Sequence, residues 1–158
     1  MGTVVSAEEA KQEYQRAMGQ ETGERFYDLW QDVSALHVYW AEYVVLFGTH
    51  EKRVDLLNRV ASGFAWMLDT MMWERTMIHI TRLLDSPKDG KQQRASLRAL
   101  PRLVDAGIKD ALEGQLNVVS SRAGFCWRWR DGYIAHRDLD LALNKGAKPL
   151  PEGSRAKV

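Results

Sequence analysis

Proline is absent from the first 86 residues of this chain, and its four prolines are Pro87, Pro101, Pro149 and Pro151. Proline breaks helices because it lacks a backbone N–H and clashes with the preceding turn. A long proline-free stretch rich in Glu, Leu, Met, Gln and Ala therefore favours helix. Since 158 residues make about one domain, we expect an all-α, antiparallel bundle of four to five helices. We place this single domain at residues 1–146 and a flexible C-terminal tail at residues 147–158.

Local signals and apolar spacing predict the first two helices. Ser6 and Glu9 have the spacing of a capping box, and the first helix should break in the glycine-containing segment 19–23. Residues 26–48 should form the second helix, because their apolar side chains recur every three or four positions. These inward positions are Phe26, Leu29, Val33, Leu36, Trp40, Tyr43 and Phe47.

The same spacing continues through residues 54–82, with Phe64, Leu68 and Met71 expected in the core. We expect residues 88–94 to form a solvated loop and residues 96–104 a short helix or turn. The segment 109–129 again has helical spacing. A last short helix should begin after Asp138, whose side chain suits an N-cap.

Composition narrows the functional classes. Lys and Arg number 22 against 21 Asp and Glu, so the net charge of +1 provides no global field for binding long nucleic acids. The single cysteine, Cys126, excludes an internal disulfide and a cysteine-based zinc site. No apolar run approaches the roughly 18 residues of a membrane helix. We therefore expect a cytoplasmic protein without a membrane segment.

Arginines interrupt the apolar stripe of the third helix. Arg75, His79 and Arg82 share one helix face by their spacing of four and three. One interpretation is a polar pocket that binds an anion. The alternative is that the stripe reaches the surface near the helix end, or that Arg82 pairs with Asp85.

A local basic patch lies at residues 125–138, which read FCWRWRDGYIAHRD. Its cationic or titratable residues are Arg128, Arg130, His136 and Arg137, and aromatic residues alternate with them. Imidazole can move a proton to or from a ribose hydroxyl or a leaving oxygen. Guanidinium groups bind phosphate through forked donors and stabilise charge at phosphorus. These residue types suit phosphodiester transesterification, which needs no metal or cofactor, and we predict neither.

The spacing from Arg130 to His136 would arise by chance in a chain this rich in arginine, so its context matters. The string RDGYIAHRD resembles the Arg-x(4–6)-His signature of the HEPN superfamily, small helical bundles found in prokaryotic toxin–antitoxin, abortive-infection and CRISPR ribonucleases. The upstream blocks HVYWAEYVVLFG and ITRLLDSPKDGKQQRASLRAL resemble its abortive-infection branch.

The resemblance implies a role for each matching residue. His136 would be the general acid/base, Arg130 would bind the scissile phosphate, and Asp131 would orient the site. Within the same patch, Arg128, Arg137 and Tyr133 would bind RNA. The resemblance also implies a homodimer, with an RNA substrate and scope for an antitoxin partner, in prokaryotic defence or toxin–antitoxin biology.

Two alternatives remain beside this metal-independent endoribonuclease. Comparable proteins continue after the histidine into a substantial helix, whereas here a short helix and a Gly/Pro/Lys-rich tail follow. That difference favours a non-catalytic HEPN-like module binding nucleotide, RNA or a partner protein. A third interpretation is purely structural: Arg130 pairs with Asp131 or Asp138 at a helix end.

Overall fold

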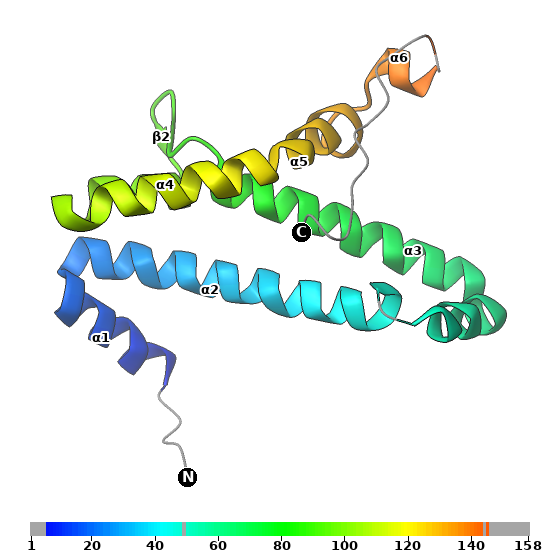
Figure 1. Cartoon of the computed structure of the whole chain (residues 1–158), viewed down its shortest axis with the longest axis horizontal. Coiled ribbons are helices and arrows are strands. Elements are labelled where there is room, and N and C mark those ends of the chain that lie inside the picture. Colours follow the sequence, from blue (N-terminus) through cyan, green and yellow to red (C-terminus); the bar gives the residue numbers. More distant parts are fainter. Residues whose placement is uncertain (1–5, 49, 144, 146–158) are drawn as a thin grey trace. The chain divides into compact units, whose positions relative to one another are not determined.

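The computed structural model describes residues 6–48, 50–143 and 145. Its α-helices are α1 (Ala7–Met18), α2 (Gln20–Tyr43), α3 (Glu51–Leu84), α4 (Ala106–Arg122), α5 (Gly124–Trp129) and α6 (Leu139–Ala142) (Figure 1). Shorter helical segments are the π-helical η1 (Val44–Gly48) and η3 (Arg130–Ile134) and the 3₁₀-helical η2 (Leu97–Arg102). The predicted all-α class is confirmed, with one small β-hairpin added.

The chain divides into two compact units. Unit 1 comprises Met1–Ser34 and Leu83–Val118, and unit 2 comprises Ala35–Arg82 and Val119–Val158. The helices α2, α3 and α4 each contribute residues to both units. The predicted tail at 147–158 lies outside the described residues.

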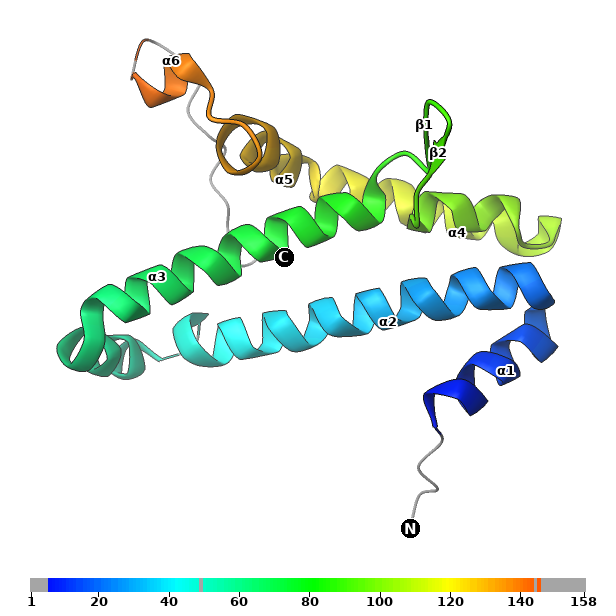
Figure 2. The same ribbon diagram turned by 180° about the vertical axis from the view of Figure 1, so that it is seen from behind.

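In unit 1, α1 folds back along the first part of α2 (Figure 2). The predicted capping box is present, with Ser6 accepting from the Glu9 N–H and Glu9 accepting from the Ser6 N–H. The helix ends at Gly19, whose φ of 85° suits glycine. The helices approach closely at Gly23, where a Cβ atom would lie 2.4 Å from the Tyr14 carbonyl oxygen.

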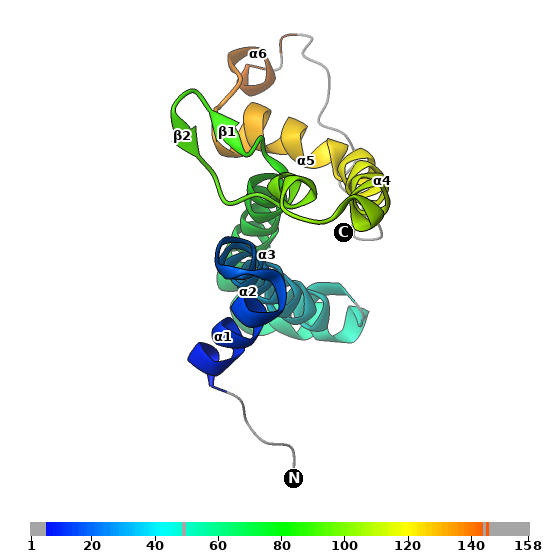
Figure 3. The same ribbon diagram turned by 90° about the vertical axis from the view of Figure 1, so that its left-hand side faces the viewer.

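The segment predicted as a loop, 88–94, contains a hairpin of β1 (Lys88–Asp89) and β2 (Gln92–Gln93) (Figure 3). The loop prediction was therefore wrong for these positions, although all of them are exposed as expected. The turn contains Gly90 at a φ of 57°, a value that glycine adopts readily. After the hairpin, η2 confirms the short helix predicted there.

In unit 2, the end of α2 packs against α3 through aromatic rings. Trp40 and Tyr43 each contact Trp73, with ring centroids 6.5 Å and 6.1 Å apart. Tyr39 lies near His79, farther along α3, so the two helices run antiparallel here, as predicted. Tyr43 and Phe47 are buried, which confirms the inward face expected for the second helix in this unit.

The buried face of α3 differs from the prediction. Phe64 is 57% exposed and Met71 is 59% exposed, while Leu68 is only half-buried. Buried positions on the helix are instead Ala65, Thr76, Met77, His79, Thr81, Leu83 and Leu84. The backbone is non-helical at Ala61, just before a Ser–Gly pair, a sequence at which helices commonly kink. The kink breaks the register assumed from uniform spacing, and Figure 1 shows the bend near the start of α3.

Near the end of the described chain, α6 begins after Asp138, whose carboxylate accepts from the Leu141 N–H at 3.0 Å. This confirms the predicted N-cap. Among the described helices, none is long and apolar enough to cross a membrane.

Candidate functional site

The basic patch lies on α5, η3 and the turn that leads to α6, all in unit 2. Two consecutive side chains of α5, Phe125 and Cys126, are buried and fix this short helix to the unit. Burial raises the pKa of the Cys126 thiol to about 12. The residue therefore stays a neutral packing group near neutral pH and is no candidate nucleophile.

Backbone hydrogen bonds fold residues 130–138 into a tight corner. The Ala135 N–H donates to the Arg130 carbonyl at 2.7 Å, an i to i−5 bond that makes η3 a π-turn. The Asp138 N–H then donates to the Gly132 carbonyl at 3.1 Å. His136 lies between these two bonds, so the same local structure fixes the backbone positions of Arg130 and His136.

Arg130 and Asp131 are joined directly. The Nε of Arg130 donates to Oδ1 of Asp131 at 2.7 Å, and the side chains are 24% and 57% exposed. The purely structural interpretation allowed Arg130 to pair with Asp131 or Asp138. The pair with Asp131 is present, while the carboxylate of Asp138 caps α6. A guanidinium carries five donors, so a bond through Nε orients Arg130 and is compatible with anion binding.

The other predicted site residues are exposed around this corner. His136, Arg128 and Arg137 are exposed, and Tyr133 is 48% exposed. The structure therefore brings Arg130 and Asp131 into contact and places His136 in the same corner. It also leaves two further arginines and one aromatic ring accessible on the same short segment.

A series of aromatic contacts anchors the site to the rest of unit 2. The Trp129 ring meets Tyr133 edge-on at 5.7 Å and Trp73 edge-on at 6.3 Å. Trp73 in turn contacts Trp40 and Tyr43 of α2. We did not predict this role for Trp73, because the assumed register of α3 placed its neighbours inward. The high tryptophan content, 6 in the chain, was the available signal.

The three residues singled out on α3 differ in burial, and two of them lie against the Tyr39 ring. Arg75 is exposed and its guanidinium carbon lies 4.4 Å from the centre of the Tyr39 ring, a cation–π contact. His79 is buried at 5% exposure, with its ring 6.3 Å from that of Tyr39. Arg82 is exposed, and Asp85 lies 3.9 Å from Arg94. Part of the stripe thus reaches the surface, as the structural alternative expected.

The described residues contain no cluster of three or more His, Cys, Asp or Glu side chains arranged to hold a metal ion. What the corner does contain is an oriented guanidinium, an exposed imidazole and accessible cations. Such groups can hold a phosphate and transfer protons beside it.

Comparison with known protein families gives a match to most of the chain. The profile of the HEPN family described as AbiU2 matches residues 19–158, which include both units' helices from α2 onward and the whole Arg130–Asp138 corner. No curated protein and no solved structure matches the chain. Because the match extends over most of the sequence and includes the predicted signature, this chain belongs to the AbiU2 family of HEPN domains, an abortive-infection-associated family.

Proposed function

We propose that this chain is a metal-independent endoribonuclease of prokaryotic defence or toxin–antitoxin type, acting in the cytoplasm. The observation that carries this proposal is the corner in which Asp131 orients Arg130 while His136 lies exposed in the same hydrogen-bonded turn. Membership of a HEPN family adds support, because the sequence signature of that superfamily falls on these residues.

The reaction is an internal transesterification. His136 removes the proton from a ribose 2′-hydroxyl, and the resulting oxygen attacks the adjacent phosphorus. The bond from phosphorus to the 5′-oxygen breaks, and that oxygen takes up a proton as it leaves. Arg130 stabilises the negative charge that develops on the phosphoryl oxygens. The products are a 2′,3′-cyclic phosphate and a 5′-hydroxyl, with no net oxidation or reduction.

RNA binding would use the accessible side chains around the corner. Arg128 and Arg137 would contact phosphates on either side of the scissile bond through charge-assisted hydrogen bonds. Tyr133 would stack on a base, since every base presents a π-face to an exposed aromatic ring. Its edge-on contact with Trp129 would hold the ring in place.

We also propose that the active form is a homodimer. The first part of α3 carries an apolar surface in unit 2, which we call the α3 apolar surface. Its members are 44–76% exposed and comprise Leu56, Val60, Phe64, Met67 and Met71. So many exposed large apolar side chains on one helix are unusual for a monomer and typical of an interaction site. A second copy can cover them because a two-fold interface joins the same surface of both subunits. An antitoxin protein is the competing occupant.

The test is cleavage of total RNA in EDTA by the wild type, His136→Ala and a matched control, His50→Ala. His50 is also exposed and lies in unit 2, but outside the corner. We expect the wild type and His50→Ala to cut and His136→Ala to be inactive with unchanged circular dichroism. Cleavage that survives in His136→Ala would overturn the assignment.

The second candidate is a module that binds RNA or nucleotide without cutting it. The exposed Arg128 and Arg137 beside the oriented Arg130 favour it, because they suit phosphate binding with or without catalysis. Arg130→Lys separates the two functions, since an ammonium cannot reproduce a forked phosphate contact. An endoribonuclease should lose roughly 100-fold or more of its cleavage rate in this variant. A binding module should show no cleavage in the wild type and lose RNA affinity in the variant.

A further inference from the structure

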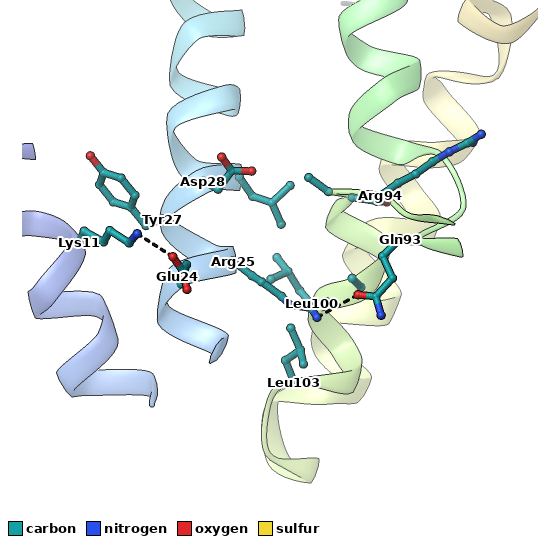
Figure 4. Close-up of a pocket in the computed structure, with 13 residues that line it drawn as sticks. Lys11, Glu24, Arg25, Tyr27, Asp28, Gln93, Arg94, Leu100 and Leu103 are labelled. Carbon is teal, nitrogen blue, oxygen red and sulfur yellow. Dashed lines mark hydrogen bonds and ion pairs between the residues drawn. The ribbon is translucent and has the colours of Figure 1, made fainter. Parts of the chain in front are cut away.

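Unit 1 contains a pocket that the proposed function does not use. It has a volume of about 470 Å³ and lies between α2 and residues 93–103, with one contribution from α1 (Figure 4). Pockets for small molecules typically have volumes of roughly 300–1,000 Å³. The pocket is therefore large enough for a small ligand or for one long side chain of a peptide.

The inner wall of the pocket is apolar. Leu29 of α2 and Ala99 and Leu100 of η2 are buried side chains that line it, and Leu103 adds to the same wall. The position of η2 against α2 is supported by the Thr22 hydroxyl, which donates to the Leu103 carbonyl at 3.3 Å. A ligand that fills this space should therefore carry a hydrocarbon portion.

The cations that line the pocket already have carboxylate partners. Lys11 pairs with Glu24 at 2.7 Å, and this contact raises the pKa of the lysine. Arg25 pairs with Glu21 at 2.8 Å and also donates to the Gln93 side chain at 3.2 Å, which links α2 to the facing segment. These groups line the pocket and, because they are already paired, are poorly placed to attract an anion.

The guanidinium of Arg94 also has a carboxylate partner. Its guanidinium is directed away from α2 in Figure 4 and pairs with Asp89 of the hairpin. Its contribution to the lining is therefore made by the stem and backbone of the residue rather than by its charge.

The carboxylate of Asp28 differs from these paired groups. Asp28 is an exposed residue of α2 that lines the pocket, and within the described chain no lysine or arginine forms an ion pair with it. An apolar wall beside one uncompensated carboxylate is complementary to a cation carried on a hydrocarbon stem. An ammonium or guanidinium would add a charge-assisted hydrogen bond at Asp28.

We propose that this pocket is a binding site for an amphipathic organic cation, an ammonium or guanidinium group on an apolar stem. Two kinds of molecule carry such a cation: a free amine or polyamine, and a peptide with an arginine or lysine side chain. Binding here is independent of RNA cleavage, because none of the lining residues belongs to the corner at Arg130 and His136.

The test titrates the full chain with 4-phenylbutylamine and follows backbone amides by ¹H–¹⁵N NMR. We expect shifts at Leu29, Leu100 and their neighbours, and none with 4-phenylbutyrate, which carries the opposite charge. Asp28→Asn should weaken binding at least tenfold, whereas Asp28→Glu should retain it. The matched control is Asp110→Asn, which removes an exposed carboxylate of α4 outside the pocket and should leave the affinity unchanged.

Spermidine and the peptide acetyl-Leu-Arg-Leu-amide then distinguish the two sources. The probe that binds more tightly, with the same dependence on Asp28, identifies the source. Equal affinity of 4-phenylbutylamine for the wild type and Asp28→Asn would overturn the assignment. So would the absence of shifts at pocket amides up to about 10 mM amine, a concentration that detects even millimolar affinity.

Discussion

Arg130 has a hydrogen bond that both a structural and a catalytic role require. Its Nε contact to Asp131 fixes the guanidinium plane, and the π-turn at η3 fixes its backbone through the bond from Ala135. The backbone bond belongs to the π-turn whatever the side chain does, so these two contacts suit either role. The exposed imidazole of His136 in the same turn is what makes phosphate chemistry the stronger interpretation.

The buried thiol of Cys126 gives a prediction about a single side chain. Because burial raises the pKa of its thiol to about 12, almost none of it is thiolate at pH 8. We expect the native protein to react with iodoacetamide far more slowly than the unfolded chain, in which the thiol is accessible. Mass spectrometry of alkylated samples with and without guanidinium chloride checks this. Equal labelling rates in both states would show that α5 is not packed as described.

Residue-level features were predictable from sequence where their causes are local. Ser6 and Asp138 cap helices through contacts three residues away, so their spacing identified them. Arg130, Asp131 and His136 were proposed as site residues because the family signature is contiguous, and the contact between Arg130 and Asp131 is present. The supporting role of Trp73 was not predicted, because it depends on rings of α2 and α5 that are distant in sequence.

Among the elements, α2 followed its apolar spacing and α3 did not. Continuous spacing from Phe26 to Phe47 predicted the inward face of α2 and η1, where Leu29, Tyr43 and Phe47 are buried. In α3 the non-helical backbone at Ala61 changes the register, and spacing alone gives no warning of it. The Ser–Gly pair after Ala61 was the only local hint.

The corrected face of α3 predicts the effect of two substitutions. Met77 is fully buried, so Met77→Ala should lower the free energy of unfolding by about 2–5 kcal/mol. Phe64 is 57% exposed, so Phe64→Ala should cost less than about 1 kcal/mol when the chain is kept monomeric. Urea unfolding at low protein concentration measures both. A larger loss of unfolding free energy for Phe64→Ala than for Met77→Ala would contradict this buried face and support the one predicted from uniform apolar spacing.

The contact between α1 and α2 gives a further prediction. Gly23→Ala would place Cβ 2.4 Å from the Tyr14 carbonyl oxygen, a distance that backbone atoms cannot relieve without moving the helix. We expect α1 to detach and its amides to exchange faster by hydrogen–deuterium exchange.

The matched control for this variant is Gly114→Ala in α4. A Cβ at Gly114 would meet nothing within 4 Å, so alanine should be neutral or stabilising there by its higher helix propensity. Unchanged exchange of α1 in Gly23→Ala would contradict the close approach of the two helices.

At the scale of the whole molecule, the α3 apolar surface predicts self-association. A stable dimer buries at least about 1,000 Å² and should persist at tens of micromolar. Sedimentation should therefore show a dimer of the 18.1 kDa chain, and Phe64→Ser should shift it to monomer. Ile108→Ser, which removes an apolar side chain that is 58% exposed from α4, should leave the dimer intact. A monomeric wild type would contradict the homodimer and favour another partner for this surface.

The chemistry of the cleaved RNA ends tests the central claim most directly. If His136 moves protons and Arg130 stabilises the phosphoryl charge, the wild type in EDTA should leave 5′ fragments that end in a 2′,3′-cyclic phosphate or its hydrolysis product. A single 2′-deoxy substitution at the scissile nucleotide should block that cut, because the nucleophile is then missing. Fragments with 3′-hydroxyl ends, or cleavage that persists at the 2′-deoxy position, would contradict the account.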